Sequence, residues 1–198
     1  MIEDIDCLCK SGLASLAFFY CDFRDNQKQD SRGLISSLLL QLCAQSDPYS
    51  NILSNFYSSH GRGSHHASDD QLKSCLKEIL KLPEQPPIYI IVDGVDECPK
   101  SFGMPSPRKT VLTLMEELVG LGLPSLRICV TSRPEVDIEA VLRPLAFHSV
   151  SLHEERGQTQ DIFDYVTFVV NSDPEMRKWR IEDKERVIEV LSLKADGM

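Results

Sequence analysis

The stretch Ile88-Tyr-Ile-Ile-Val-Asp-Gly-Val-Asp-Glu-Cys-Pro99 decides how the fold of this chain is interpreted. Its apolar run predicts a buried strand over 88–92, and three acids follow it: Asp93, Asp96 and Glu97. A buried parallel strand with carboxylates at its carboxyl end is the arrangement that magnesium–nucleotide chemistry requires. The competing interpretation is a turn with solvated acids, because Asp-Gly and Asp-Glu pairs are common in turns.

No Gly-x-x-x-x-Gly-Lys-Ser/Thr phosphate loop accompanies these acids. Two segments approach the pattern, but Pro99 replaces the second glycine of 94–101, and Arg108 replaces that of 103–110. Proline has no N–H to donate to a phosphate, and no strand precedes the second segment. The sequence therefore predicts the metal half of a nucleotide site without its phosphate half.

Arg133 is a further candidate for a nucleotide contact. It follows the apolar segment 126–131, so it lies one strand later, at the carboxyl edge where ligands of open α/β sheets bind. A guanidinium at this edge can contact a γ-phosphate and stabilise charge during phosphoryl transfer. The alternative is a salt bridge to Asp93, Asp96 or Glu97. The two interpretations are compatible, because an empty site favours that ion pair.

Strands alternate with helices along most of the chain, which predicts an α/β fold with a parallel sheet flanked by helices. The pattern becomes wholly helical toward the end, which predicts a helical C-terminal extension. The predicted elements are helix 2–10, strand 13–23, helix 33–45, a helix capped by Ser68 or Asp69, strand 88–92, helix 109–120, strand 126–131, helix 135–143, strand 147–152, and helices 159–170 and 182–194.

Bulk properties exclude several classes of protein. The 198 residues carry a net charge of −9, which argues against a nucleic-acid binder, because a phosphate backbone attracts Lys and Arg. No apolar run reaches the ~20 residues of a membrane helix, so no membrane partner is expected. The acidic N-terminus does not resemble a signal peptide, and the seven cysteines are odd in number. Reduced, buried cysteines and a cytoplasmic location are the simplest interpretation.

A loop is predicted over 58–67, where His60, His65 and His66 lie among glycines and serines. A metal site requires partner ligands at a defined spacing, which this loop does not offer. We interpret the three histidines as part of a solvated loop.

These motifs resemble the NACHT domains of STAND P-loop NTPases. The type that they resemble most closely is the nephrocystin-like N-terminal NTPase domain, which occurs in fungal NLR-like proteins with ankyrin or WD repeats. The resemblance rests on segments in the family's order: 17–23, 33–45, 88–99, 126–135 and 194–198. It implies that the α/β fold is a partial P-loop NTPase of the ASCE/STAND type.

The resemblance also implies a role for each candidate residue. Asp93 would be the Walker B residue, binding Mg²⁺ through water and thereby the nucleotide. Asp96 and Glu97 would form the catalytic acid cluster, and Arg133 would be a catalytic and phosphate-sensing arginine. The cofactor implied for the intact parent protein is Mg²⁺ with ATP or GTP. This chain alone is expected to bind neither ATP nor GTP with Mg²⁺ tightly, because the phosphate loop supplies most of the affinity for the triphosphate.

According to the resemblance, the chain is an excerpt. The family's first strand and phosphate loop would precede residue 1, and its helical lid would only begin near residue 198. The implied domains are an incomplete NACHT-like NTPase core over 1–155 and the start of the helical lid over 156–198. In that fold the missing strand lies between strands 126–131 and 147–152, so a gap is expected there, and with it a marginal, aggregation-prone chain.

Three functions remain open from the sequence. The first is a nucleotide-dependent signalling switch, whose partners are the nucleotide and other protein domains or protomers reached through oligomerisation. The second is a non-catalytic interaction scaffold that retains the NTPase fold. The third is a gene-model fragment without independent activity.

Overall fold

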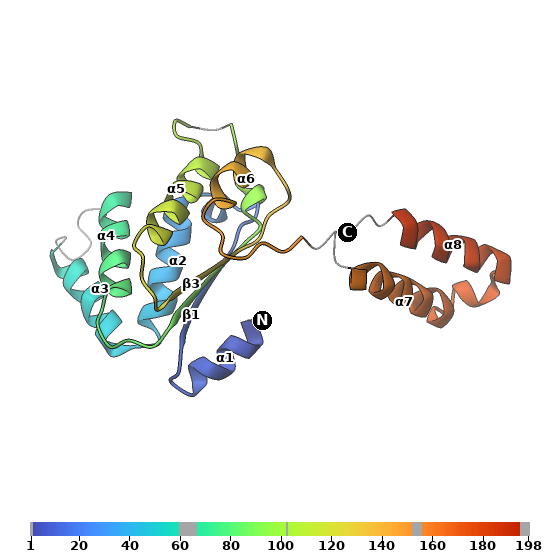
Figure 1. Ribbon diagram of the computed structural model, residues 1–198, viewed down its shortest axis with the longest axis horizontal. Helices are drawn as coiled ribbons and strands as arrows, with labels where there is room; N and C mark the ends of the chain where they lie inside the picture. Colours follow the sequence, from blue (N-terminus) through green and yellow to red (C-terminus); the bar gives the residue numbers. More distant parts are fainter. Residues whose placement is uncertain (1, 60–66, 102, 152–155, 195–198) are drawn as a thin grey trace. The chain divides into compact units, whose positions relative to one another are not determined.

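The computed structural model describes residues 2–59, 67–101, 103–151 and 156–194 (Figure 1). Contacts divide the chain into two compact units, Met1–Ala146 and Phe147–Met198, which are described separately. The predicted histidine loop falls largely on 60–66, outside the described residues, and so do residues 195–198 of the last segment of the family resemblance.

The first unit is built on a three-stranded parallel sheet. Its strands are β1 (Ser15–Tyr20), β2 (Ile88–Asp93) and β3 (Leu126–Val130), in the spatial order β1-β2-β3. Both neighbouring pairs are parallel, and their register aligns Ala17 with Ile90 and Ile90 with Ile128. The predicted parallel sheet flanked by helices is therefore confirmed, although β1 and β3 are shorter than predicted and β2 is one residue longer.

Six α-helices of the first unit connect or flank these strands. They are α1 (Ile2–Lys10), α2 (Ser31–Cys43), α3 (Asp47–Ser59), α4 (Asp69–Leu80), α5 (Pro107–Val119) and α6 (Val136–Leu142). Side-chain caps fix several starts: Asp30 accepts from Gly33 N, Ser106 accepts from Lys109 N, and Ser68 forms a capping box with Gln71. The helix capped by Ser68 is thus confirmed, whereas α3 was not predicted.

The core lies against one face of the sheet. Alternate strand residues contribute to it, which is the two-residue period expected of a sheet face. Strands supply Ala17, Phe19, Ile88, Ile90 and Val92, and the helices supply Leu34, Leu38, Leu42, Leu76, Ile79, Leu80, Val111, Met115 and Leu118. Helices α3 and α4 pack against α2 and against each other, and α5 packs against α2 (Figure 1).

Two glutamine side chains, Gln41 on α2 and Gln45 just after its end, bond to the outer edge of β1. Gln45 accepts from Leu16 N at 2.9 Å and donates to Leu16 O at 2.6 Å. One helical turn earlier, Gln41 accepts from Phe18 N at 3.0 Å and donates to Phe18 O at 2.7 Å. Each amide presents one donor and one acceptor, as a neighbouring strand would. The outward backbone groups of Leu16 and Phe18 are therefore satisfied without a fourth strand.

The predicted strand 147–152 is wrong over 147–151, which belongs to no strand. The Phe147 side chain is 94% exposed. Its apolar residues resemble a strand locally, but a strand is stable only where a neighbour pairs with its backbone, and the described sheet ends at β3. Residue 152 lies outside the described part of the chain.

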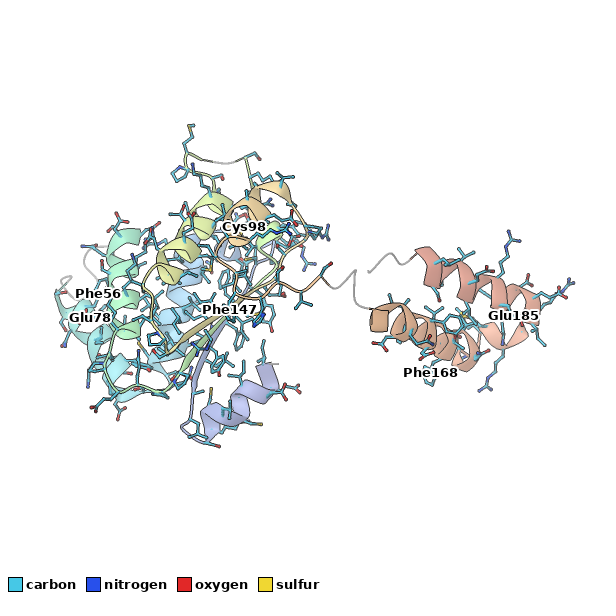
Figure 2. All side chains as sticks on the ribbon, in the orientation of Figure 1. Phe56, Glu78, Cys98, Phe147, Phe168 and Glu185 are labelled. Atoms are coloured by element: carbon cyan, nitrogen blue, oxygen red, sulfur yellow. The ribbon has the colours of Figure 1, made fainter. Side chains whose placement is uncertain are left out.

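The second unit consists of α7 (Arg156–Ser172), a short 3₁₀ turn η4 (Met176–Lys178) and α8 (Ile181–Lys194). The two long helices pack against each other, which confirms the predicted helices 159–170 and 182–194. Val170 and Ile188 are buried, whereas Phe168 is 69% exposed (Figure 2). Across the described residues, no helix has the length and apolar character needed to cross a membrane.

The glutamine contacts predict a measurable contribution to stability. Replacing Gln41 and Gln45 by Leu keeps much of their volume but leaves the N–H and C=O of Leu16 and Phe18 without protein partners. We expect the double variant to lower the free energy of unfolding by about 1 to 3 kcal/mol in urea titrations.

Gln27→Leu is the matched control, because Gln27 is exposed and its side-chain amide bonds to none of the described residues. It should change stability by less than about 0.5 kcal/mol. Equal effects of the double variant and the control would contradict the role given to the two glutamines.

Candidate functional site

The carboxyl ends of the three strands meet at one edge of the sheet, because all of them run parallel. Asp93 ends the middle strand, β2. On one side Cys21 follows β1, and its N–H donates to Asp93 O at 2.9 Å. On the other side Thr131 follows β3, and its N–H donates to Val92 O at 2.9 Å. Ligands of open α/β sheets bind at this kind of edge.

The Asp93 carboxylate is held by a threonine that the sequence analysis did not single out. Thr131 Oγ1 donates to Asp93 Oδ1 and accepts from Gly94 N at 3.0 Å. The hydroxyl thus fixes one carboxylate oxygen, while Oδ2 makes no hydrogen bond to any described residue. The adjacent ends of the predicted strands 88–92 and 126–131 were the available signal for this contact.

Gly94 turns the chain sharply after Asp93. Its φ of 71° and ψ of 45° lie in the left-handed region, which favours glycine. The short 3₁₀ turn η3 (Val95–Glu97) follows, with the Val95 side chain fully buried. Because Val95 is anchored in the core, the next two residues, Asp96 and Glu97, lie partly buried at the edge of the sheet.

Each of the two later acids has its own protein partner. Asp96 makes two contacts with Arg133. Its Oδ1 accepts a hydrogen bond from the backbone N–H of Arg133 at 3.0 Å, and its Oδ2 lies 3.4 Å from the Nε atom of Arg133. Glu97 Oε2 accepts from Phe23 N at 3.3 Å. The structure therefore brings Asp93, Asp96 and Arg133 to one edge, and the Arg133 ion pair that the sequence left open is formed with Asp96.

The two partners differ in exposure. The Arg133 side chain is 80% exposed and that of Asp96 is 10% exposed. The carboxylate is therefore fixed by its surroundings, whereas the guanidinium is held by a single long contact. Arg133 can leave Asp96 for another anion without disturbing packed side chains.

A buried arginine, Arg108, organises the turn that carries Asp96 and Glu97. In the sequence it stands out only because it replaces the second glycine of a phosphate-loop pattern. The Arg108 side chain, on α5, is 6% exposed. Its Nε donates to Cys98 O at 2.9 Å, and its Nη2 donates to Asp96 O. Its Nη1 forms ion pairs with Glu135 and Asp137 at the start of α6. Arg108 thus joins the acidic turn, α5 and α6 through one guanidinium.

Lys100 completes this ion-pair cluster from the loop after η3. Its ammonium contacts both Glu135 and Asp137. Hydrogen bonds from Lys100 and, to a smaller extent, from Arg108 lower the pKa of Glu135. Lys100 is therefore engaged with the acids at the start of α6.

Two buried thiols adjoin the acids. Cys21 and Cys98 are both buried free thiols (Figure 2 labels Cys98). The side-chain interaction between the two thiols lowers the pKa of Cys98, and together with burial it raises the pKa of Cys21. The expectation of buried, reduced cysteines is confirmed for Cys21, Cys75 and Cys98, while Cys7 is exposed.

The donor set suits Mg²⁺ only with water. Among the described residues, no group of three His, Cys, Asp or Glu side chains is placed to hold a metal ion. Mg²⁺ commonly keeps several waters and binds through one or two carboxylates together with substrate phosphates. Thr131 fixes one oxygen of Asp93, and no described residue bonds to the other, so Asp93 fits that water-mediated role and could not hold the ion by itself.

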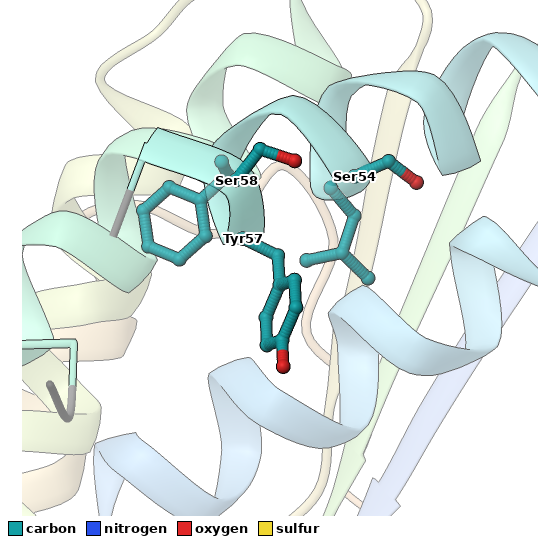
Figure 3. Close-up of a pocket in the computed structure, with 5 residues that line it drawn as sticks. Ser54, Tyr57 and Ser58 are labelled. Carbon is teal, nitrogen blue, oxygen red and sulfur yellow. The ribbon is translucent and has the colours of Figure 1, made fainter. Parts of the chain in front are cut away.

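A separate open hollow lies on α3 (Figure 3). It is lined by Leu53, Ser54, Phe56, Tyr57 and Ser58. These side chains are apolar or hydroxyl-bearing, and none is charged. The hollow therefore offers no charged side chain to a metal ion or a phosphate, and it includes none of the acids at the carboxyl edge.

Comparison with protein families finds a match over most of the first unit. The family described as "Nephrocystin 3, N-terminal" matches residues 2–133, which include β1, β2, β3 and every acid of the candidate site. The chain belongs to this family. Searches of curated proteins and of solved structures find no match. Membership in the nephrocystin 3 N-terminal family agrees with the type of domain that the sequence resembles.

Arg108 is predicted to be the most sensitive charged residue of this region. Arg108→Met keeps the apolar stem but leaves the carbonyls of Asp96 and Cys98 without their donor. We expect a loss of about 3 kcal/mol in the free energy of unfolding, measured by denaturant titration. The amide NMR signals of Asp96 and Glu97 should shift in the same variant.

Arg24→Met provides the control, because Arg24 pairs with Asp22 at the surface and its side chain is 75% exposed. Exposed pairs contribute about 0 to 1 kcal/mol. If both variants lost the same stability, Arg108 would not have the organising role described above.

Proposed function

We propose that the carboxyl edge of this sheet is the metal-binding half of a nucleotide-dependent switch of the NACHT type, acting on Mg–ATP or Mg–GTP. The observation that carries the proposal is the placement of Asp93. It ends the central strand beside Asp96 and Arg133, with one oxygen bonded to Thr131 and the other bonded to none of the described residues. Membership in the nephrocystin 3 N-terminal family supports it at the level of the family.

The proposed roles follow from chemistry and exposure. Asp93 would hold Mg²⁺ through water, and the ion would neutralise charge on the terminal phosphates. Asp96 or Glu97 would orient or deprotonate the attacking water. Arg133, mostly exposed and tethered to Asp96, would exchange that carboxylate for a phosphate oxygen, since both are bidentate anions for a guanidinium.

A non-catalytic scaffold is the second candidate. One observation favours it: Asp93, Asp96 and Glu97 each have a protein hydrogen-bond donor already, from Thr131, Arg133 and Phe23 respectively. Acids in such a network can serve only to hold three strand ends together. The two candidates differ in whether Asp93 binds a divalent ion.

Paramagnetic NMR with Mn²⁺ as a probe for the Mg²⁺ site distinguishes them. If Asp93 holds the ion, Mn²⁺ at millimolar concentration should broaden the amide signals of residues 93–97 selectively. Asp93→Asn should abolish that broadening, because an amide carries no charge for the ion. Asp25→Asn removes a surface acid that caps η1, and it should leave the broadening unchanged.

Broadening that is absent, or that persists in Asp93→Asn, would support the scaffold and contradict the switch. Unfolding of Asp93→Asn is excluded as an explanation if its remaining amide spectrum overlays that of the wild type.

Nucleotide turnover by this chain is expected to be undetectable. The sequence contains no Gly-x-x-x-x-Gly-Lys-Ser/Thr loop, and phosphate contacts supply most of the affinity for a triphosphate. Phosphate-release assays with Mg–ATP and Mg–GTP should match the buffer blank. Micromolar binding of Mg–ATP in isothermal titration, lost in Asp93→Ala, would overturn the assignment of only the metal half of the site to this chain.

A further inference from the structure

Two cysteines follow two neighbouring segments at the carboxyl edge of the sheet. Cys21 comes directly after β1, and Cys98 comes directly after η3. The N–H of Cys21 donates to Asp93 O at 2.9 Å. Two residues later, the N–H of Phe23 donates to Glu97 Oε2 at 3.3 Å. The chain after β1 therefore runs beside the turn that leads from β2 to Cys98, although the two cysteines lie far apart in the sequence.

Both cysteine side chains belong to the same buried cluster. Cys21 continues the core-facing row of Ala17 and Phe19 on β1, at the two-residue period of a strand. Cys98 enters the cluster together with Val95 of η3 (Figure 2). Cys21 is 8% exposed and Cys98 is fully buried. The side chains of the two thiols interact with each other, so the fold places two free thiols next to each other.

The surroundings of Cys98 favour its reactive form. Burial by itself makes a thiol unreactive, and at Cys75 burial raises the pKa to about 11. At Cys98 the interaction with Cys21 lowers the pKa most, and the charge of Arg108 lowers it further, against the effect of burial. The guanidinium is fixed there, because Arg108 Nε donates to Cys98 O at 2.9 Å. The pair thus combines a nucleophilic thiol with a second thiol placed to receive it.

We propose that Cys21 and Cys98 form a reversible disulfide on reaction with a peroxide, and that this bond is a redox switch acting on the acidic turn. The disulfide joins the end of β1 to the end of η3. Asp96 and Glu97 lie on the turn just before Cys98, so the bond holds both acids against the sheet. Reduction returns the turn to its noncovalent contacts.

The reaction requires only a peroxide as co-reactant. The Cys98 thiolate attacks one oxygen of hydrogen peroxide, the O–O bond breaks, and the hydroxide that leaves takes up a proton to become water. Cys98 is then a sulfenic acid. The Cys21 sulfur attacks the Cys98 sulfur, the S–S bond forms as the S–O bond breaks, and the hydroxyl leaves with the Cys21 proton as a second water. Each sulfur loses one electron, and the peroxide gains two. A thiol reductant reverses the reaction by exchange.

The disulfide and Arg108 hold the same turn by different routes. Arg108 donates to the carbonyls of Asp96 and Cys98 from α5, whereas the disulfide reaches the turn from β1. The bond also closes a long loop that contains α2, α3, α4 and β2. Cross-links that close long loops restrict the unfolded chain most. The oxidised chain should therefore unfold at a higher urea concentration, and it should depend less on Arg108.

Peptide mapping of the oxidised chain tests the proposal. The folded, fully reduced chain is treated with hydrogen peroxide, its remaining thiols are blocked with iodoacetamide, and its peptides are identified by mass spectrometry. We expect one peptide pair joined through Cys21 and Cys98, which dithiothreitol separates. The amide NMR signals of residues 94–98 should shift on oxidation and return on reduction. Metal and nucleotide are absent, so the outcome is independent of the proposed function.

Alanine variants supply the controls. Cys21→Ala and Cys98→Ala should each abolish the linked peptide pair, whereas Cys75→Ala removes a buried thiol outside the pair and should leave it unchanged. Arg108→Met should lower the urea midpoint less in the oxidised chain than in the reduced chain. An equal loss in both would contradict the claim that the disulfide anchors the turn.

The wild-type map decides the outcome even if a variant folds poorly. A disulfide that forms only in urea would show that the two thiols are merely packed in the core. Linkage through another cysteine, or oxidation of Cys98 to a sulfinic acid without linkage, would overturn the pairing. A Cys21–Cys98 disulfide that leaves the signals of residues 94–98 in place would overturn the switch.

Discussion

The double pairing of β2 is the constraint on which the rest of this structure depends. Hydrogen bonds to β1 and β3 on its two sides satisfy the backbone of β2, and its side chains are buried from Ile88 to Val92 except for half-buried Tyr89. The first acid is possible only where the strand ends, at Asp93. Because all three strands run parallel, the residues that follow them meet the acids at the same edge.

Most of the fold could be predicted from local sequence, because period and capping are local properties. Helices α2, α4 and α5 and all three strands follow from apolar spacing and from caps such as Ser68. Helix α3 was missed, although Ile52, Leu53 and Phe56 recur at helical spacing and pack against the core. The polar residues between them make the apolar stripe short and hard to recognise. The segment 147–151 was misjudged because strand formation depends on a partner strand, which local pattern does not report.

The candidate site was predicted in its acids but not in the residues that hold them. Asp93, Asp96, Glu97 and Arg133 stand out because their charge follows apolar runs. Arg108 drew attention only as a defect in a phosphate-loop pattern, yet its guanidinium joins the acidic turn to two helices. Contacts of this kind cross ten or more residues of sequence and depend on how α5 docks. Sequence spacing alone therefore cannot place them.

The glutamine pair Gln41 and Gln45 has a consequence for assembly as well as for stability. A sheet with two open edges can grow from both sides and so extend without limit, as cross-β fibrils do. Here Gln41 and Gln45 occupy the outward backbone donors and acceptors of Leu16 and Phe18, so a further strand can pair with this part of β1 only by displacing both amides. The two side chains therefore protect this side of the sheet against growth by strand pairing.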